Sequence, residues 1–343
     1  MAEEAGGRRR GREGTGILFT LLAALLAAVI LGLPQRPPAP VRHAPPRAAS
    51  TATRFVVMGD SRARSSSQRL TNGPVLGRLA TVIAELRPRP RFLLFNGDYA
   101  NFEPGDGVGD HYAEWRRAMQ PASAAGIAHL PVLGNHEEDV AEFARNFDAA
   151  AAAAAAGGRF TAMPSDPWTY SVDFGRFHVL VLNNYPPPPD APGAKITAAQ
   201  LRFAEGALEA NSSVPSIVAS HEPAFPVAKH IGGSLDRRPV LRDRLCRTMD
   251  SLGARLLVVG HEHHYSRLTI DSSLVKGMRG KVLQLQSSTA GIAATRGPRR
   301  RTDFFRARAY AFTLVDVADR GLELRTFDQH GAVIDAAFVP TGD

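Results

Sequence analysis

The sequence predicts an α/β fold for residues 54–343, and three patterns lead to this prediction. Five short apolar runs have the length and composition of buried strands, at residues 54–58, 92–95, 130–133, 216–219 and 256–259. Between the first two runs, apolar residues from Val75 to Leu86 recur at helical spacing, and Pro88 ends that helix. Polar residues follow each run directly, as they do where the strands of an open α/β sheet carry a site at their carboxyl ends.

Further elements follow in chain order. The sequence predicts a hairpin over residues 169–174 and 177–182, a helix that opens with a capping box at Thr197 and Gln200 and ends near residue 210, and strands at 281–286, 310–317 and 322–327. The eight alanines at 149–156 can extend a helix, which Gly157 and Gly158 then end. With 44% hydrophobic residues the chain can bury a core, which excludes global disorder.

The polar residues at the strand ends are all oxygen or nitrogen donors. They are Asp60, Asp98, Asn135 with His136, His221, and His261 with His263. A single Asp or His in such a place commonly caps a helix or lies satisfied in a core. Five of them, each at the end of an apolar run, instead predict a metal site.

The kinds of donor narrow the chemistry. Two carboxylates, one amide oxygen and at least three imidazoles can hold two divalent or trivalent cations if one carboxylate bridges them. Cys246 is the only cysteine, so a disulfide framework and a cysteine-rich structural zinc site are both excluded. Paired ions of this kind activate water at neutral pH and neutralise a phosphoryl transition state.

The ordered blocks Gly59-Asp60, Gly97-Asp98, Gly134-Asn135-His136-Glu137, His221 and Gly260-His261-Glu262-His263 resemble the calcineurin-like metallophosphoesterase superfamily. The resemblance covers roughly residues 54–330. It implies a four-layer α/β/β/α sandwich of two mixed β-sheets. It also implies a phosphoric ester hydrolase with two metal ions, of iron, manganese or zinc, in which a metal-bridged hydroxide attacks phosphorus in line.

The resemblance also assigns roles to residues at matching positions. Asp98 would bridge the two ions, Asp60 and His263 would bind the first, and Asn135, His221 and His261 would bind the second. His136 would protonate the leaving group as general acid, and Glu137 would orient it.

The first block departs from the family pattern. Most members have Asp-x-His there, whereas this chain has Asp60-Ser61-Arg62. Purple acid phosphatases also lack that histidine but have a tyrosine three residues after the bridging aspartate, where this chain has Asn101. That branch is therefore not assigned. Arg62 is a candidate catalytic residue that binds substrate phosphate, or else an ordinary exposed or ion-paired arginine.

Several other polar residues match no block. His264 either lines the pocket or faces solvent, and four histidines are expected to be structural or exposed: His111, His129, His178 and His230. The arginines between residues 296 and 308 form the densest basic cluster of the body. Such a cluster either attracts anionic substrates or lipid headgroups or is a solvated loop.

The N-terminal region predicts a location. A basic tail at residues 1–15 precedes an uncharged apolar run at 16–33, which spans about 27 Å as a helix and matches a bilayer. This run is either an uncleaved signal anchor or a cleaved signal peptide. A proline-rich linker follows at 34–53, and the arginines before the run predict that the domain at 54–343 is exported.

The net charge of +8 does not predict a nucleic-acid partner. Residues 1–50 hold seven arginines and three glutamates, so half of the excess lies before the predicted domain. The predicted partners are a phosphate ester substrate and, through the N-terminal helix, a membrane. A nuclease is disfavoured by the predicted export and by the lack of a basic stripe with interleaved aromatics. The alternative function is a degenerate, membrane-tethered binding module, because the first block lacks its histidine.

Overall fold

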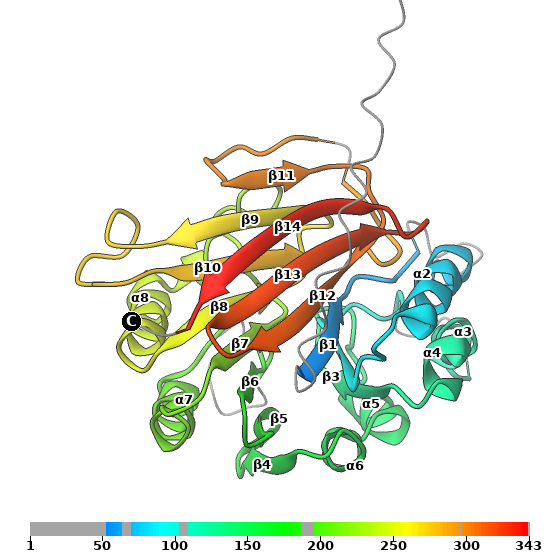
Figure 1. The fold of residues 1–343 in the computed structure, drawn as a ribbon, viewed down its shortest axis with the longest axis horizontal. Helices are drawn as coiled ribbons and strands as arrows, with labels where there is room; N and C mark the ends of the chain where they lie inside the picture. The colour runs from blue at the N-terminus through cyan, green and yellow to red at the C-terminus, as the bar shows by residue number, and fades with distance from the viewer. Residues whose placement is uncertain (1–52, 64–69, 103–108, 187–194, 295, 342–343) are drawn as a thin grey trace, which may run out of the picture. The chain divides into compact units, whose positions relative to one another are not determined.

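The computed structural model describes residues 53–63, 70–102, 109–186, 195–294 and 296–341. The predicted basic tail, the apolar run at 16–33 and nearly all of the linker lie outside these residues. Among the described residues, no helix has the length and hydropathy needed to cross a membrane. Strands and helices alternate along the described domain, as the sequence pattern predicts (Figure 1).

A six-stranded mixed sheet begins the domain. Its strands, in spatial order, are β14 (Val333–Pro340), β13 (Gly321–Asp328), β12 (Ala311–Ala318), β1 (Thr53–Met58), β2 (Phe92–Phe95) and β3 (Ala128–Pro131). The strands β1, β2 and β3 run parallel, and β12 pairs with β1 antiparallel. The helices α2 (Gly73–Glu85), α3 (Ala113–Ala118), α4 (Gln120–Ala124) and α5 (Val140–Asn146) contribute to the core on one face of this sheet.

The second sheet is also mixed and has eight strands. Its order is β11 (Phe304–Arg306), β9 (Tyr265–Ile270), β10 (Val282–Ser287), β8 (Ala254–Val259), β7 (Ser216–Ser220), β6 (His178–Leu182), β5 (Asp166–Asp173) and β4 (Arg159–Met163). Strands β6, β7, β8 and β10 are mutually parallel. Helices α6 (Ala149–Ala155), α7 (Ala198–Ala210) and α8 (Pro239–Ser251) accompany it.

Alternation along the strands produces three apolar cores. In β1, Phe55 and Val57 face a core shared by both sheets, whereas Val56 and Met58 face a core shared with α2, α3 and α4. A third core lies between the second sheet and α7 and α8. The two mixed sheets with helices on their outer faces agree with the predicted α/β/β/α sandwich.

Most predicted elements are present at nearly the predicted bounds. The hairpin is β5 and β6, paired antiparallel, and the capping box of Thr197 and Gln200 opens α7. The alanine run forms a short helix of its own, α6, because the Asp148 side chain caps its first turn. Strands β4, β9, β11 and β14 and helices α3, α4, α5 and α8 were not predicted.

Candidate metal centre

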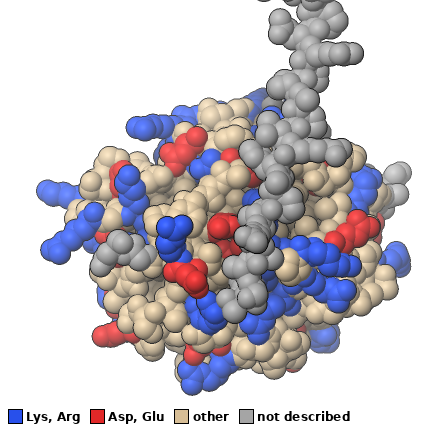
Figure 2. All heavy atoms as spheres, in the orientation of Figure 1, with Lys and Arg blue, Asp and Glu red and all other residues tan. Residues whose placement is uncertain are grey.

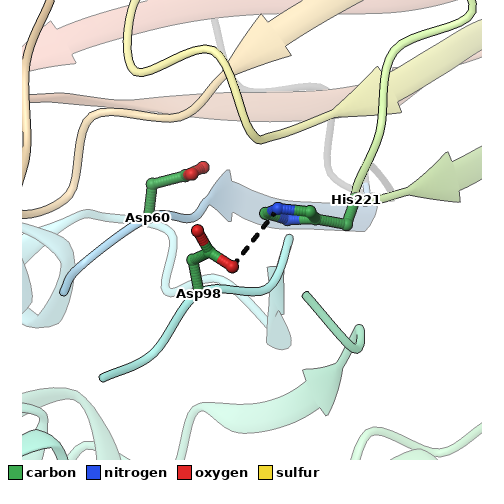
Figure 3. A group of neighbouring side chains, drawn as sticks. All are labelled: Asp60, Asp98 and His221. Carbon is green, nitrogen blue, oxygen red and sulfur yellow. Dashed lines mark ion pairs between the residues drawn. The ribbon is translucent and has the colours of Figure 1, made fainter. Parts of the chain in front are cut away.

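The predicted donors meet where the carboxyl ends of the parallel strands of both sheets converge. The backbone of the β1 end is joined to the β2 end, since the Asp60 N–H donates to the Gly97 carbonyl at 2.9 Å. In the second sheet, the Gly260 N–H after β8 donates to the His221 carbonyl after β7 at 2.8 Å. Asp60, Asp98 and His221 each offer a ligand atom within 4.8 Å of the others (Figure 3).

Backbone strain is concentrated in these loops. Four predicted metal ligands have positive φ: Asp60 at 61°, Asp98 at 56°, His261 at 79° and His263 at 59°. Left-handed backbone costs a residue with a side chain of order 1–3 kcal/mol, and it persists where the surroundings over-determine it. The loops therefore hold their side chains in one arrangement, which is what a preorganised site requires.

Two glycines allow the loops to approach this closely. A Cβ atom at Gly134 would lie 2.4 Å from the Asp98 backbone nitrogen. A Cβ atom at Gly260 would lie 2.6 Å from the Asn96 carbonyl oxygen and 2.9 Å from Asp60 Oδ2. Side chains at either position would separate the donors, so these glycines are needed for close packing rather than for a turn alone.

Three candidate donor atoms lie close to His221 Nε2, and with it they are called here the four-donor group: Asp98 Oδ1, Asn135 Oδ1 and His261 Nδ1. His221 Nε2 lies 3.3 Å from Asp98 Oδ1, 3.2 Å from Asn135 Oδ1 and 3.1 Å from His261 Nδ1. Ligands about 2.1 Å from a metal ion, at angles between octahedral and tetrahedral, lie about 3.0–3.4 Å apart. The spacing of the four-donor group therefore fits a divalent metal ion.

The tautomer of His221 suits a ligand. Its Nδ1 lies 2.6 Å from the Asn96 backbone carbonyl, which accepts only from a protonated nitrogen, so the lone pair is on Nε2. Burial, and next the neighbouring His221 and His230, lower the pKa of His261 well below its usual range. A neutral imidazole offers the lone pair that a metal needs.

Asp98 and Asp60 lie side by side without solvent. Asp98 Oδ2 is buried and accepts no hydrogen bond from the described residues, but it is ion-paired with Arg62, whose Nε lies 3.3 Å away, so this oxygen lies in a place that suits a cation. Burial raises the pKa of Asp98, but His221, His136 and Arg62 more than offset it, so that this pKa lies below its usual range. Burial and then the Asp98 charge raise the pKa of Asp60. Both Asp60 oxygens accept from the His261 N–H at 3.1 Å.

His263 and Arg62 lie close to Asp60 and to the second carboxylate oxygen of Asp98. His263 Nε2 is 3.5 Å from Asp60 Oδ1. The Arg62 guanidinium places Nε 3.3 Å from Asp98 Oδ2 and Nη2 3.4 Å from His263 Nε2. Arg62 is therefore part of the cluster and is not an exposed surface arginine.

His136 lies at the edge of the site. Its backbone N–H donates to Asp98 Oδ1 at 3.2 Å, and its Nε2 is 3.9 Å from Asp98 Oδ2. The side chain is half-buried, so it can meet both substrate and solvent. Burial lowers its pKa, and attraction to Asp98 only partly offsets this.

Glu137 contacts backbone rather than the imidazole of His136. Its carboxylate accepts the backbone N–H groups of Asp98 at 2.9 Å, Tyr99 at 3.0 Å and Gly134 at 2.7 Å. Burial and the Asp98 charge raise its pKa to about 8. The contacts of Glu137 thus join the two loops that carry Asp98 and Asn135, and it is a positioning residue.

Two further residues contribute to the site and were not predicted from the sequence. The His230 ring stacks on the ligand candidate His261 with centroids 3.9 Å apart, although its position suggested a structural or exposed residue. Asn96 supplies the carbonyl that fixes His221. The sequence signals neither role, because that of His230 depends on how its loop packs and that of Asn96 depends on a backbone atom. His264 neither faces solvent nor lines the pocket, since it is buried against Ser266 and Phe305.

A cavity of about 470 Å³ opens beside Arg62 and His263. Three exposed cations, Lys229, Arg296 and Arg299, contribute to its wall. Its one acidic lining residue, Glu262, has its carboxylate engaged by the backbone N–H groups of residues 227, 228 and 230. The cavity therefore has a positive wall next to the metal-ligand candidates, and part of the basic cluster predicted from sequence forms it.

Solved structures with the same fold include several phosphatases. A purple acid phosphatase, PPD1, from yellow lupin (Lupinus luteus) superimposes with a TM-score of 0.61 at 16% identity over 85% of this chain and 54% of its own. GAP50, the anchor in the inner membrane complex of Plasmodium, superimposes with a TM-score of 0.56 at 13% identity over 85% of this chain and 90% of its own. PhoD superimposes with a TM-score of 0.52 at 10% identity over 86% of this chain and 73% of its own. The chain thus spans about half of the lupin enzyme, and these low identities show the fold alone.

The family assignment rests on a comparison of the sequence with family models. No curated protein matches the sequence significantly. The family model for calcineurin-like phosphoesterases matches residues 53–265, which include every candidate donor described above. This match, with donor residues at the strand ends of two mixed sheets, shows that the chain belongs to the calcineurin-like phosphoesterase family.

Proposed function

We propose that the chain is a metal-dependent hydrolase of phosphoric esters. The observation that carries this proposal is the four-donor group, in which three buried or half-buried donor atoms lie 3.1–3.3 Å from His221 Nε2. Asp98, Asn135, His221 and His261 would hold a metal ion, which would supply a water of lowered pKa and positive charge to offset that of the phosphoryl group. Family membership supports the same reaction class.

The residues of this chain have separate tasks in that reaction. Arg62, whose guanidinium can match two phosphate oxygens, binds and orients the phosphoryl group. His136, half-buried beside Asp98, donates a proton to the leaving oxygen. Glu137 and Asp60 hold the loops through backbone N–H groups. Their rigidity keeps the donors in place during turnover.

The substrate is anionic and enters beside Arg62. The cavity of about 470 Å³ is large enough for a small organic phosphate, and its positive wall favours substrates with negative charge. On the face seen in Figure 2, basic side chains are interrupted by acidic and uncharged surface. This supports a small phosphate ester and gives no support to a nucleic acid as substrate. Monoester or diester preference does not follow from these residues.

The sequence also predicts a second ion, bound by Asp60, Asp98 and His263. That part of the prediction has less support from the geometry, because Arg62 lies between Asp98 and His263. The same observation favours a second candidate function, a metal-poor binding module without turnover. We further propose that residues 16–33 anchor the exported domain to a membrane or direct its secretion, as the sequence pattern predicts.

One assay separates the two candidate functions. The purified full-length protein is loaded with Mn²⁺, Fe²⁺ or Zn²⁺ and incubated with nitrophenyl phosphate and bis-nitrophenyl phosphate. The hydrolase produces nitrophenol from at least one ester, and a chelator abolishes the reaction. Metal-loaded protein that hydrolyses neither ester would support the binding module. The relative rates also identify monoester or diester preference.

A further inference from the structure

The strongest departure from the family pattern is the side chain of Arg62. Its position in the first block is where most of the family has a histidine, and the whole side chain is only 14% exposed. The backbone there is fixed, since the Arg62 N–H donates to the Asp98 carbonyl at 3.2 Å and Arg62 forms a β-bridge with Thr71. The side chain therefore leaves a defined point and turns inward.

A buried amide holds the guanidinium in the cluster. Asn101 Nδ2 donates to the Ala63 carbonyl at 3.0 Å, which fixes the orientation of the amide. Asn101 Oδ1 then accepts from Arg62 Nη1 at 3.1 Å. Asn101 is 7% exposed, so this contact is shielded from water. Arg62 is thus positioned from behind by a residue of the β2 loop.

The guanidinium shares its partners with the predicted first metal. That ion would need Asp98 Oδ2 and His263 Nε2, which lie 3.3 and 3.4 Å from Arg62 nitrogens. An arginine has no lone pair to offer a metal and keeps its charge at all accessible pH values. A divalent ion between the same two groups would meet this fixed positive charge at close range. The four-donor group, by contrast, contains no cationic side chain.

We propose that the centre holds one metal ion, in the four-donor group, and that the Arg62 guanidinium replaces the second cation beside Asp98. The proposal rests on the proposed function and refines it. Asp98 then bridges one metal ion and one guanidinium. Arg62 takes over the charge of the absent ion, and a substrate phosphate binds between the metal and the guanidinium. Asp60 acts mainly through the His261 backbone N–H, which orients the ligand loop.

Metal stoichiometry tests this directly. The full-length protein is stripped with chelator, dialysed against excess Mn²⁺, freed of unbound ion and analysed by mass spectrometry of the metal per chain. We expect one ion per chain in the wild type and two in Arg62→His, which restores an imidazole donor and removes the fixed charge. Arg300→His, at an exposed position outside the site, is the matched control and should keep one ion.

A spectroscopic readout accompanies the counts. Electron paramagnetic resonance of the wild type should show an isolated Mn²⁺ signal, whereas two ions about 3.5–4 Å apart in Arg62→His should show magnetic coupling. If Arg62→His does not fold, Arg62→Gln replaces it: loss of the charge should then raise the affinity for a second ion at least tenfold.

Three outcomes would contradict the proposal. Two tightly bound, coupled ions in the wild type would overturn the inference about Arg62 and leave the proposed hydrolase intact. A folded Arg62→His or Arg62→Gln that still binds one ion, with no second binding event, would also overturn it. No bound ion in the wild type would overturn both the inference and the proposed function.

Discussion

Metal binding at the four-donor group should stabilise the folded domain, and removal of His221 should abolish that effect. His221 Nε2 lies 3.1–3.3 Å from each of the other three donors, so His221→Ala removes the atom at the centre of the group. A ligand that binds only the folded state adds about 2.7 kcal/mol of stability at a concentration one hundred times its Kd. The wild type should gain this amount.

The expected shift in Tm follows from this free energy and the entropy of unfolding, which scales with the size of the domain. At about 2.1 cal/mol/K per residue, a domain of about 290 residues has an unfolding entropy near 0.6 kcal/mol/K, so the Tm should rise by about 4 °C. Loss of a direct ligand should weaken metal binding at least about 100-fold, by comparison with the 10–100-fold cost of losing a supporting residue. The remaining stabilisation in His221→Ala is then at most about 0.4 kcal/mol, or less than about 1 °C.

Differential scanning calorimetry of chelated protein with and without Mn²⁺ measures the shift. The comparison uses the metal-dependent difference within each variant, because His221 is fully buried and its removal lowers the starting Tm as well. His178→Ala is the matched control, since His178 is equally buried but lies in β6 beside Ser216. A full shift in His221→Ala, or its loss in His178→Ala, would refute the assignment of the four-donor group.

Four further predictions concern other residues. His136→Ala should lower kcat about 10²–10⁴-fold with the metal content unchanged, as measured by kinetics and metal analysis of the same sample; loss of metal would show that His136 is a ligand. Glu137→Ala, which leaves three buried N–H groups without their acceptor, should lower the free energy of unfolding in urea by at least about 3 kcal/mol. Burial lowers the pKa of His178 to about 4, below its unfolded value, so the unfolded state binds the extra proton as the pH falls below about 6.5. Stability should therefore fall by about 1.1 kcal/mol per pH unit from this residue between pH 6 and 4.5, and the slope should be smaller by that amount in His178→Gln. Finally, Arg296→Gln with Arg299→Gln should raise KM for nitrophenyl phosphate a few-fold and reduce its dependence on salt, with kcat unchanged; an unaltered salt dependence would remove these arginines from substrate attraction.

Short strands that are buried along their whole length could be predicted from sequence. All four residues of β2 are buried and apolar, and in β7, where all five residues are buried, Ile217, Val218 and Ala219 form an apolar run between two serines. Strand β14 was missed because only Val339 of its residues is buried, and its sequence alternates weakly at the sheet edge. Helix α8 was missed because arginines occupy much of its surface, which hides the buried positions Leu245 and Met249.

The donor residues could be predicted because they follow recognisable strands, but their partners could not. The approach of Arg62 to Asp98 depends on Asn101, which another loop supplies. Sequence suggested that Glu137 orients His136, because the two are neighbours. The structure instead directs the Glu137 carboxylate to backbone N–H groups, two of them 38 and 39 residues away in the chain. Such contacts arise from the packing of loops and leave no periodic pattern.

The central claim, metal-dependent hydrolysis at the four-donor group, is tested most directly by following metal binding and catalysis in the same titration. Metal-stripped full-length protein receives Mn²⁺ in steps, and bound ion and nitrophenyl phosphate hydrolysis are measured at each step. We expect the rate to be negligible without metal, to rise in proportion to bound ion and to saturate with it, and we expect His261→Ala to show neither binding nor hydrolysis. A metal-saturated wild type without hydrolysis, or hydrolysis that persists in metal-free protein, would contradict this claim.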